Sequence, residues 1–548
     1  MPLGTYWRTA RQLSISQLAA RAGRILRVAA PSEVECQIEL SHVAQFWRSP
    51  IPKAERWRST DTWVCHGSVW LIDSNRPWLV PGMPALQAYI LHYLDDLSST
   101  SALRDPANHL WLLDSWVGLH GRRGSFAWDP YPVSRRLVNV CKWAMSGGRL
   151  YGSAVNVLGS HAELLLRNPE TDLRANHLLA NAVALIFAGN LLSEPLRSRC
   201  ARLGADILAT QITKQVLPDG GHYERSPMYH ATVLEDLLDA RNVLSSQGGP
   251  LVGEIEARVP GMLRWLHAMT FPDGYPGQFN DTAQAEAPTL RSLLAYARRL
   301  DVPSNAVVEH GVLHLRESGF ARVTVGAWTV IADIGTVGPD DQPGHAHAGT
   351  LSFEASLGAH RLIVNTGVST YEPSARRVAE RGTASHNTVE FDGADSSEVW
   401  ASFRVGRRAR VMGAQTNWDG RCAEIRARHD GYAWLRGRPI HERVWRINRG
   451  AIQIEDRVKS SGSHELRARI HVHPRFDVRH DLGRALLIFD PLGSGVARVD
   501  PGDWMSAAIT DFQYSANFGI TQAAKCIELR ASTVGDAALR SSVDLIET

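Results

Sequence analysis

Several features that would place this 548-residue chain in a specialised class are missing from it. Its six cysteines lie far apart and form no Cys-x-x-Cys pair, which excludes a disulfide framework and a thiolate zinc site. No run approaches the roughly 18 apolar residues of a membrane span. Residues 1–30 carry five scattered arginines and lack the unbroken apolar stretch of a secretory signal. We therefore expect a cytoplasmic protein, or a periplasmic one if translation starts elsewhere.

The composition is otherwise that of an ordinary globular protein. Apolar residues make up 44% of the chain and charged residues 21%, which excludes disordered and fibrous classes. The formal net charge of +3 argues against a general nucleic-acid binder, since such proteins normally carry a strongly basic domain. At about 150 residues per domain, the length favours two to four domains.

Lysine is scarce. Only five of the 59 basic residues are lysine, and the other 54 are arginine. A compositional bias of the genome explains such an excess. Alternatively, some of the arginines line a site for carboxylate or sulfate groups, because the planar guanidinium binds two oxygens at once.

The two halves of the chain differ in hydrophobic pattern. Between Pro84 and Leu300 the apolar spacing is helical, and from about Val307 it changes to short alternating segments bounded by Gly, Asp or Asn. The clearest helical stretches are Ala85–Leu97, Leu173–Leu192 and Val233–Leu244, and the clearest strands are Ala321–Ile334, Thr350–Leu357, Arg361–Val364, Thr388–Phe391 and Ala451–Val458. Helices followed by strands predict an α+β multidomain protein without βαβ alternation. We expect a helical or irregular segment over residues 1–84, a helical domain over 85–302 and a strand domain over 303–548.

Two clusters in the helical half could carry chemistry. Asn176-His177 lies inside an otherwise apolar helix, where a histidine is more often a core residue than a functional one. Pro218–His230, reading PDGGHYERSPMYH, places several ionisable side chains in a loop and a helix start, and Ser226-Pro227 is typical of an N-cap followed by proline at the first helical position. Tyr229 in this segment fits the apolar face of the following helix equally well.

Two further clusters lie in the strand half. In His345-Ala346-His347 the two imidazoles would share one face of a strand, as two metal ligands or as one ligand and one base, although two surface histidines give the same pattern. His386-Asn387-Thr388 follows three arginines, Arg376, Arg377 and Arg381. The chain has no Gly-x-Ser-x-Gly elbow and no glycine-rich phosphate loop, which argues against the serine hydrolases and the P-loop enzymes.

These segments resemble the heparinase II/III-like polysaccharide lyases over most of the chain. The matching strings occur in family order: AYILHYLDDL (88–97), WDPYPVSRRLVN (128–139), NHLLAN (176–181), DGGHYERSPMYHATVLEDLLD (219–239), HAHAGTLSFEASLGAHRLIVNTGVSTY (345–371) and RGTASHNTVEFDG (381–393), with HDGY (429–432) and IHERVW (440–445) after them. The resemblance implies an incomplete (α/α) toroid followed by an antiparallel β-sandwich domain. It also implies β-elimination on a uronic-acid polysaccharide.

The chemistry of β-elimination agrees with the residue types. The enzyme must neutralise the uronate carboxylate, remove the C5 proton and protonate the leaving oxygen at C4. By their match to the family, Asn176 and His177 would neutralise the carboxylate. Tyr229 would be the general acid, or acid and base in turn, and His345 would be the general base. The syn and anti routes both remain open.

The resemblance and the local sequence also suggest residues that bind substrate. A tyrosine that acts as a base needs a lowered pKa, which nearby arginines would provide, with Arg225 as the local candidate and Arg135 and Arg136 as weaker ones. The substrate-binding residues that we expect are Arg225, His222, Glu224, Arg135, Arg136 and Arg381.

A metal site is implied by the resemblance, but with one departure. His347 and His386 match two metal ligands of the family, and Asn365 stands where the family has an aspartate. An amide oxygen is a poorer zinc ligand than a carboxylate. One divalent metal, with zinc as the first candidate, is therefore expected at a weakened site.

Other functions remain open. A glycoside hydrolase needs two carboxyl groups beside the scissile bond, and Asp219, Glu224, Asp273 and Asp281 are available. A non-catalytic protein for carbohydrate binding or exopolysaccharide assembly would also fit the Asn365 departure. For a lyase, the substrate would be an acidic polysaccharide or oligosaccharide of the glycosaminoglycan type, such as heparan sulfate, hyaluronan or chondroitin, with alginate or a bacterial exopolysaccharide as the alternative.

Overall fold

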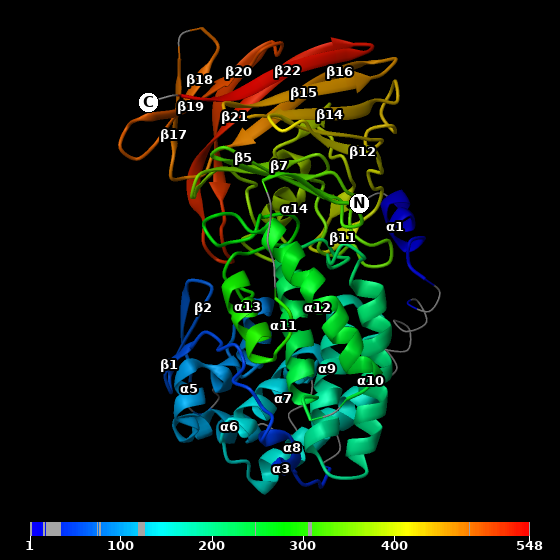
Figure 1. The fold of residues 1–548 in the computed structure, drawn as a ribbon, viewed down its shortest axis with the longest axis vertical. Coiled ribbons are helices and arrows are strands. Elements are labelled where there is room, and N and C mark those ends of the chain that lie inside the picture. Colours follow the sequence, from blue (N-terminus) through cyan, green and yellow to red (C-terminus); the bar gives the residue numbers. More distant parts are fainter. Residues whose placement is uncertain are drawn as a thin grey trace.

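The computed structural model describes residues 3–14, 17, 34–73, 75, 78–118, 126–246, 248–304, 310–481 and 483–546. Helices gather at one end of the elongated molecule and strands at the other (Figure 1). The expected boundary at 302/303 falls between the last helix of the helical half, α13 (Leu290–Arg299), and the first strand of the other half, β4 (Gly311–Leu315). Among the described residues, no helix has the length and apolar character needed to cross a membrane.

The helical half is built mainly from long antiparallel helices that pack side by side. Its remaining helices and 3-10 turns are α3 (Ser41–Ala44), α4 (Ala85–Leu91), η1 (Asp95–Ser98), α5 (Thr100–Arg104), η2 (Pro106–His109), α6 (Leu110–Val117), η3 (Phe126–Trp128), α7 (Pro130–Met145), α8 (Gly152–Arg167), α9 (Ala175–Leu191), α10 (Leu196–Gln215), α11 (Pro227–Val243) and α12 (Pro250–Met269). The expected helix Ala85–Leu97 is interrupted after Leu91, because Leu94 adopts a left-handed backbone conformation with φ of 56°.

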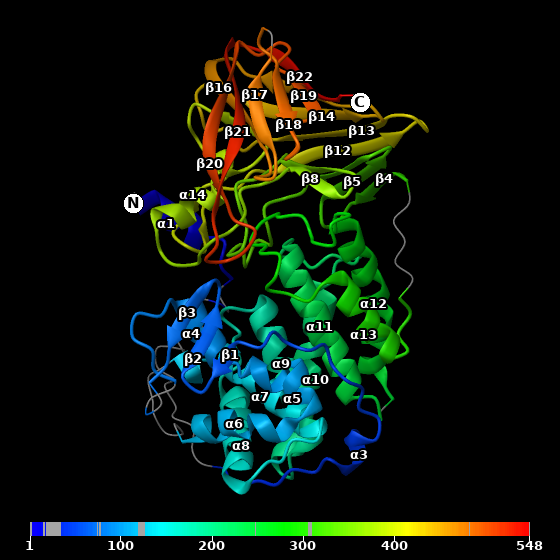
Figure 2. The ribbon, with the colours of Figure 1, turned by 90° about the vertical axis from the view of Figure 1, so that its left-hand side faces the viewer.

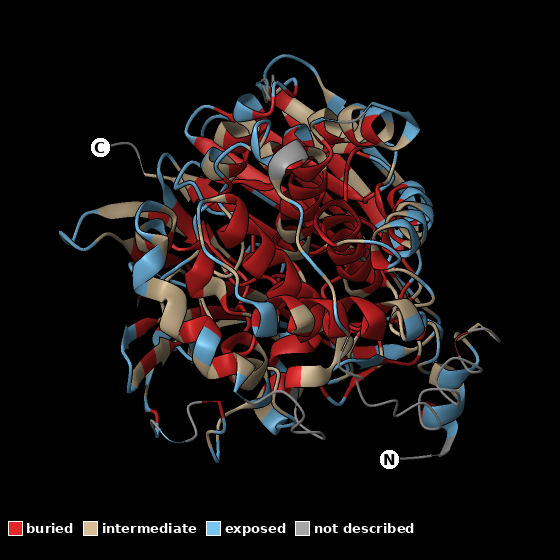
Figure 3. Ribbon diagram, turned by 90° about the horizontal axis from the view of Figure 1, so that it is seen from below, coloured by how far each residue is buried: buried red, intermediate tan, exposed pale blue. Residues whose placement is uncertain are grey.

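Helix α9 is the centre of this half. Every residue of α9 except His177 is buried, because the helix packs against α7, α10 and α11. A Cβ at Gly189 would lie 2.5 Å from the backbone nitrogen of Ala201, so glycine lets α10 approach α9 closely. Figure 3, which views the molecule from the helical end, shows buried residues filling this interior.

The N-terminal segment differs from the expectation of a helical or irregular region over residues 1–84. It contains a three-stranded antiparallel sheet of β1 (Trp57–Ser59), β2 (Thr62–Cys65) and β3 (Ser68–Leu71). His66 and Gly67 join β2 to β3 with φ of 50° and 73°, the two positive values of a two-residue hairpin turn. Before this sheet, α1 (Leu3–Ala10) lies against the strand half, where Arg8 and Thr5 bind Glu398 (Figure 2).

All paired strands among the described residues of the strand half are antiparallel, and one isolated bridge, between Gly367 and Ser515, is parallel. Its sheets have the orders β12-β13-β14-β15-β22-β19-β18-β17, β20-β21-β16-β9, β4-β5-β6-β7-β8 and β10-β11. The strands after β4 are β5 (Phe320–Val325), β6 (Trp328–Asp333), β7 (Phe353–Leu357), β8 (His360–Ile363), β9 (Val389–Phe391), β10 (Val399–Trp400), β11 (Arg404–Val405), β12 (Val411–Trp418), β13 (Ala423–His429), β14 (Ile440–Ile447), β15 (Ala451–Lys459), β16 (Ser463–His471), β17 (Asp477–His480), β18 (Leu486–Phe489), β19 (Gly495–Asp500), β20 (Ser506–Tyr514), β21 (Gln522–Val534) and β22 (Ala537–Leu545). The short helix α14 (Ala375–Arg381) and turn η4 (Thr383–Ser385) connect β8 to β9.

A single apolar core joins the three large sheets of this half. A polar network lies beside it. Arg443 on β14 donates two hydrogen bonds to Asp456 and one each to the carbonyls of Leu351 and Asn387. His441 Nε2 lies 2.7 Å from Asp456 Oδ1. The network thereby fixes the chain next to His386 and just before β7.

The loop between α12 and α13 connects the two halves. Arg361 on β8 pairs with Asp273, and the Gln278 side chain donates to the carbonyl of Ser515 at 2.8 Å. The backbone of Gly367, with φ of 77°, packs so closely on Ser515 that a Cβ would lie 1.8 Å from its carbonyl oxygen. These polar contacts fix the orientation of the strand half on the helical half.

Candidate functional site

A cleft of about 1000 Å³ opens where the helical half meets the strand half. Helices α4, α7, α9 and α11 supply one wall, and three loops of the strand half, at residues 340–345, 371–373 and 401–405, supply the other. All four residues that the sequence assigned to catalysis line this cleft: Asn176, His177, Tyr229 and His345. They come from three separate segments of the chain.

Tyr229 and His345 are in direct contact across the two halves. Their rings are stacked with centroids 3.8 Å apart and planes inclined by 15°. The Tyr229 hydroxyl lies 3.1 Å from the hydroxyl of Tyr371, which also lines the cleft. Ser226 caps α11 by accepting a hydrogen bond from the Tyr229 backbone N–H, so the helix start determines where this tyrosine lies.

Glu224 orients His345. Its buried carboxylate is hydrogen-bonded to His345 Nδ1. Burial alone would raise the pKa of Glu224, but the electrostatic interaction and hydrogen bond with the His345 imidazole, helped by His222, outweigh burial and lower the pKa. The anionic carboxylate holds the proton on Nδ1 and leaves Nε2 as an acceptor. Glu224 does not line the cleft, so the expectation that it binds substrate is replaced by a positioning role.

Asn176 and His177 begin helix α9 at the cleft. The Asn176 side-chain oxygen is buried and makes no hydrogen bond to any described residue. His177 Nδ1 lies 3.1 Å from Glu170, and its ring packs on Tyr131 with centroids 4.4 Å apart. A carboxylate in the cleft would find an amide and an imidazole side by side.

The pKa of Tyr229 is well above its ordinary value, chiefly because the hydroxyl is buried and secondarily because of Tyr371 and Asp281. The expectation that Arg225 lowers this pKa is wrong. The Arg225 guanidinium points away from the cleft and donates to Thr336 and the carbonyl of Gly338. Tyr229 is therefore protonated at neutral pH, which suits a general acid.

Most of the arginines in the matched segments do not reach the cleft. Arg136 donates to the carbonyls of His92 and Ala127, and Arg381 to those of Ala346 and Ala401. Both are fully buried, and so is His222, whose Nε2 lies 2.9 Å from Gln215. The expectation that these side chains and Arg225 bind substrate is therefore corrected, since they hold backbone carbonyls and neighbouring side chains inside the walls. Arg135 does line the cleft, paired with Asp236 at 2.6 Å.

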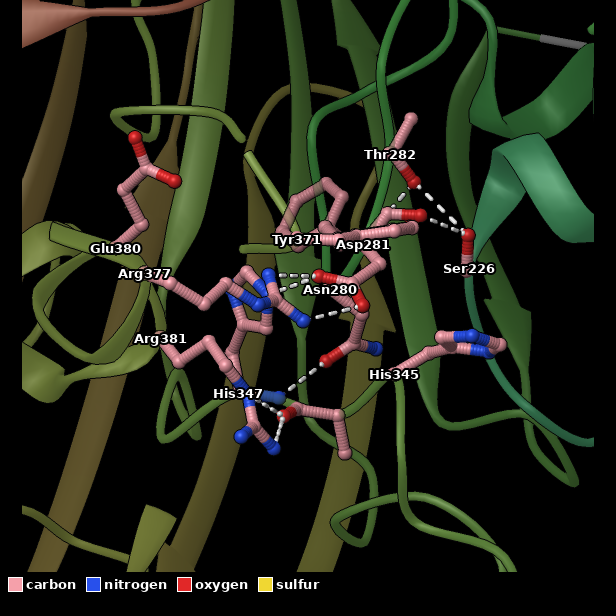
Figure 4. Close-up of polar contacts among 12 residues, drawn as sticks. Ser226, Asn280, Asp281, Thr282, His345, His347, Tyr371, Arg377, Glu380 and Arg381 are labelled. Carbon is pink, nitrogen blue, oxygen red and sulfur yellow. Dashed lines mark hydrogen bonds and ion pairs between the residues drawn. The ribbon is translucent and has the colours of Figure 1, made fainter. Parts of the chain in front are cut away.

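The two histidines of His345-Ala346-His347 do not share a face. The segment is irregular and precedes β7, so the strand period does not apply. His345 faces the cleft, whereas the buried His347 lies with Nε2 2.8 Å from Asp281 Oδ1. Arg377 donates to both oxygens of Asp281, at 2.6 and 2.7 Å (Figure 4). The figure shows the His345 ring directed away from this ion pair.

The donor set expected for a metal does not form a complete zinc site. His386 Nδ1 lies 3.1 Å from the side-chain oxygen of Asn365, and the rings of His386 and His347 are 5.3 Å apart. Neither His347 Nδ1 nor His386 Nε2 has a hydrogen-bond partner among the described residues. The nearby carboxylate, Asp281, is already neutralised by Arg377. No group of three His, Cys, Asp or Glu side chains suited to a metal occurs in the described part of the chain.

Four carboxylates considered for a hydrolase are also engaged elsewhere. Asp219 accepts hydrogen bonds from Ser318, Asp273 pairs with Arg361, and Glu224 and Asp281 are held as described above. None of the four lines the cleft.

Sequence reasoning missed the contribution of Tyr371 and the pairing of Asp281 with Arg377. Tyr371 is the last residue of one of the matched segments, but nothing in the sequence indicates that it contacts Tyr229. Asp281 lies in the loop between α12 and α13, far in sequence from Arg377 and His347, and no spacing rule links them.

Comparison with known proteins gives matches in both halves. Residues 123–307 match the heparinase II/III N-terminus model, and residues 309–541 match the heparinase II/III-like C-terminal model. FtsZ-localized protein C of Caulobacter vibrioides is 26% identical over 344 residues, which are 60% of this chain and 55% of that protein. A heparin-sulfate lyase of Bacteroides stercoris is 22% identical over 242 residues, 40% of this chain and 34% of that enzyme. The chain thus spans about half the length of the first relative and a third of the second.

Solved structures share the fold. A heparinase III structure covers 97% of this chain and 89% of its own, with a TM-score of 0.67 at 13% identity. A chondroitin AC lyase from Streptomyces coelicolor covers 86% of this chain and 76% of its own, with a TM-score of 0.53 at 11% identity. These likenesses confirm the expected toroid and antiparallel β domain. With both family models matched in chain order, the protein belongs to the heparinase II/III-like family.

Proposed function

We propose that this protein is a polysaccharide lyase that cleaves 4-O-linked uronic-acid chains by β-elimination. The observation that carries the proposal is the stacked pair of Tyr229 and His345 in a cleft that also holds Asn176 and His177. This reaction requires a general acid, a general base and hydrogen-bond donors for the uronate carboxylate.

His345 is the base of the proposed mechanism. With Nδ1 held by Glu224, its Nε2 takes the C5 proton of the uronate, and the electrons of the C5–H bond form the C4=C5 double bond. The C4–O4 bond breaks, and the leaving oxygen takes the Tyr229 proton. The raised pKa of Tyr229 keeps that proton in place until the leaving oxygen becomes basic. Tyr371, 3.1 Å from Tyr229, supports the hydroxyl. The cycle closes when His345 releases the C5 proton to solvent and Tyr229 takes a proton from solvent.

Asn176 and His177 stabilise the charge that develops on the uronate carboxylate. Glu170, 3.1 Å from His177 Nδ1, orients this imidazole beside Asn176. The donor from Asn176 is its side-chain NH2 group, because the amide oxygen can only accept. No step is assigned to a metal ion.

The experiment is a panel of uronate polysaccharides and oligosaccharides incubated with the purified protein. A lyase gives an unsaturated uronate whose conjugated double bond absorbs ultraviolet light. Its two products together contain one water molecule less than the products of a hydrolase. Mass spectrometry of the products measures this difference. Products that carry the added water would contradict β-elimination.

One comparison favours a second candidate, a carbohydrate-binding protein without catalysis. The relative with 26% identity is named for localisation with FtsZ, not for an enzymatic activity. Under this alternative, oligosaccharides would bind in calorimetry without any product, and Tyr229→Phe would leave the affinity unchanged. The panel above and this titration separate the two functions.

A further inference from the structure

The charges that line the cleft are nearly balanced. Among the described lining residues, the basic ones are Lys53, Arg56, Arg135, Arg404 and Arg408, and the acidic ones are Asp95, Glu235, Glu286, Asp340, Asp341 and Glu372. A heavily sulfated chain carries several negative charges on each disaccharide, and a matching site would present an excess of cations. This cleft presents no such excess.

Two of the lining cations are held by acids buried beneath the surface. Lys53 Nζ lies 2.5 and 2.7 Å from the two oxygens of Glu235, and Arg135 pairs with Asp236 at 2.6 Å. The side chains of Glu235 and Asp236 are only 1% and 3% exposed. A sulfate that withdrew either cation would leave a buried carboxylate without its partner, which is strongly unfavourable.

Two more lining cations have weaker partners at the rim. Arg56 lies 3.7 Å from Glu286, and Arg408 lies 3.3 Å from Asp340. Arg404 has no carboxylate partner among the described residues, and its guanidinium lies 5.8 Å from the Trp400 ring centre. Arg404 and the two weaker ion pairs can bind an occasional negative group of the substrate. They are too few to bind several sulfates on each disaccharide.

The remaining lining suits sugar rings that carry little charge. Six aromatic side chains line the cleft together with the catalytic pair: Tyr89, Tyr93, Tyr131, Tyr371, Phe403 and Phe518. Flat aromatic faces bury the apolar faces of sugars without needing charge. For the single carboxylate of a uronate, the cleft offers the amide of Asn176 and the imidazole of His177 as hydrogen-bond donors.

We propose that the substrate is an unsulfated uronate chain, with one carboxylate per repeat as its only charge, and that the cleft discriminates against sulfated chains. This inference rests on the proposed lyase function and specifies its substrate class. The discrimination arises because sulfates would meet Asp340 and Glu372 while most cations are already paired. Asp341 does not contribute, because Arg174 and Lys214 pair with it at 2.8 and 2.6 Å.

The test compares polymers with the same backbone, with and without sulfate. Unsulfated chondroitin is paired with its sulfated forms, and the unsulfated heparan backbone is paired with heparan sulfate and heparin. We expect kcat/KM to be about ten-fold or more higher for the unsulfated member of a pair that is cleaved. Equal or faster cleavage of the sulfated member would overturn the inference.

Binding decides the question if no polymer is cleaved, because that result would count against the lyase function and not against charge selection. Calorimetry with unsulfated and sulfated oligosaccharides of equal length then measures the preference directly. Tighter binding of the unsulfated member supports the inference. Tighter binding of the sulfated member overturns it.

A charge variant tests the physical cause. Asp340 is 93% exposed, so Asp340→Asn should fold normally while it removes one carboxylate from the rim and leaves Arg408 bound only to the backbone carbonyls of Pro339 and Asp340. We expect affinity for sulfated oligosaccharides to rise about three-fold or more, as for one new charge contact at a surface. The matched control is Asp511→Asn, which releases Lys525 on an exposed part of the strand half away from the cleft. An equal effect of both substitutions would contradict the proposed cause.

Discussion

At the scale of single residues, five arginines in or beside the matched segments hold the walls of the cleft and the strand half together. Arg136, Arg225 and Arg381 donate to backbone carbonyls, and Arg377 and Arg443 neutralise buried aspartates. Five N–H groups in a fixed plane make arginine well suited to such multiple contacts. An arginine within a matched segment therefore says little about whether its side chain reaches the substrate.

Glu224 is the residue whose role is most directly testable. In Glu224→Gln the carboxylate that fixes the His345 tautomer is lost, and we expect kcat to fall about 10²-fold or more while KM changes little. Glu224→Asp should recover part of the rate because it restores the negative charge. Steady-state kinetics with the substrate that the panel identifies provides the measurement. A rise in KM with unchanged kcat would instead indicate that Glu224 contacts substrate.

Substitution of Asn365 tests whether the site of His347 and His386 binds a metal ion. The protein as purified is expected to contain much less than one zinc per chain, since the set of His347, His386 and Asn365 lacks an anionic ligand. Asn365→Asp supplies that ligand without a change in side-chain size and should raise the bound zinc towards one per chain. Elemental mass spectrometry after dialysis measures both. Stoichiometric zinc in the unaltered protein would show that a neutral amide suffices here.

At the scale of elements, the start of α11 couples stability to the site. Ser226 accepts from the Tyr229 N–H at 3.3 Å and donates to the Asp281 carbonyl at 2.5 Å. Ser226→Ala should lower the free energy of unfolding by about 1 kcal/mol, as the loss of an N-cap does, and should also lower kcat because Tyr229 shifts. Denaturant unfolding and lyase assays measure the two effects.

Ser99→Ala is the matched control for this prediction. Ser99 caps α5 by accepting from the Ala102 N–H, and it does not line the cleft. Its replacement should lower stability by a similar amount and leave kcat unchanged. Equal kcat in the two variants would mean that the cap does not position Tyr229.

The sequence was sufficient to predict the order and type of most elements. Helical periodicity located α9 and α11, and alternation located β15, because these elements bury apolar faces along most of their length. The segment expected as one strand, Ala321–Ile334, is two strands, β5 and β6, which pair with each other across a turn at Gly326. The sheet of β1 to β3 was missed because its strands are only three or four residues long. The His345 segment was predicted as a strand. In the structure it belongs to the irregular loop that precedes β7 and is not part of a sheet.

The site was predictable only in part. Motif order identified the four residues that line the cleft. It could not indicate which neighbours reach the cleft, because that depends on how the loop between α12 and α13 packs on the strand half. The ion pair of Asp281 with Arg377, and the contact of Tyr371 with Tyr229, join residues more than ninety positions apart.

At the scale of the whole molecule, buried histidines link stability to pH. Burial lowers the pKa of His92 and of His230 to about 3, and that of His222 to about 4, against an ordinary value near 6.5. The unfolded chain therefore binds protons below about pH 6.5 that the folded protein does not. The free energy of unfolding should be unaffected by these groups above pH 6.5 and should fall as the pH drops towards 4.

The expected loss is about 2 kcal/mol for each such histidine between pH 7 and pH 5. His92→Asn removes one of these groups and should reduce the difference between the two pH values by that amount. Chemical denaturation at pH 7 and pH 5 measures it, with His360→Ala, an exposed position on β8, as the control. The same pH difference in His92→Asn as in the unaltered protein would contradict this account.

The most direct test of the central claim is the rate of unsaturated-uronate formation by Tyr229→Phe and His345→Ala, measured on the best substrate of the panel. The account predicts that each substitution lowers kcat by about 10³-fold, within the range that general acid or base catalysis contributes. The controls Tyr151→Phe and His360→Ala, both exposed, should retain full activity. Activity within a few-fold of the unaltered protein in both cleft variants would contradict the assignment of Tyr229 as acid and His345 as base.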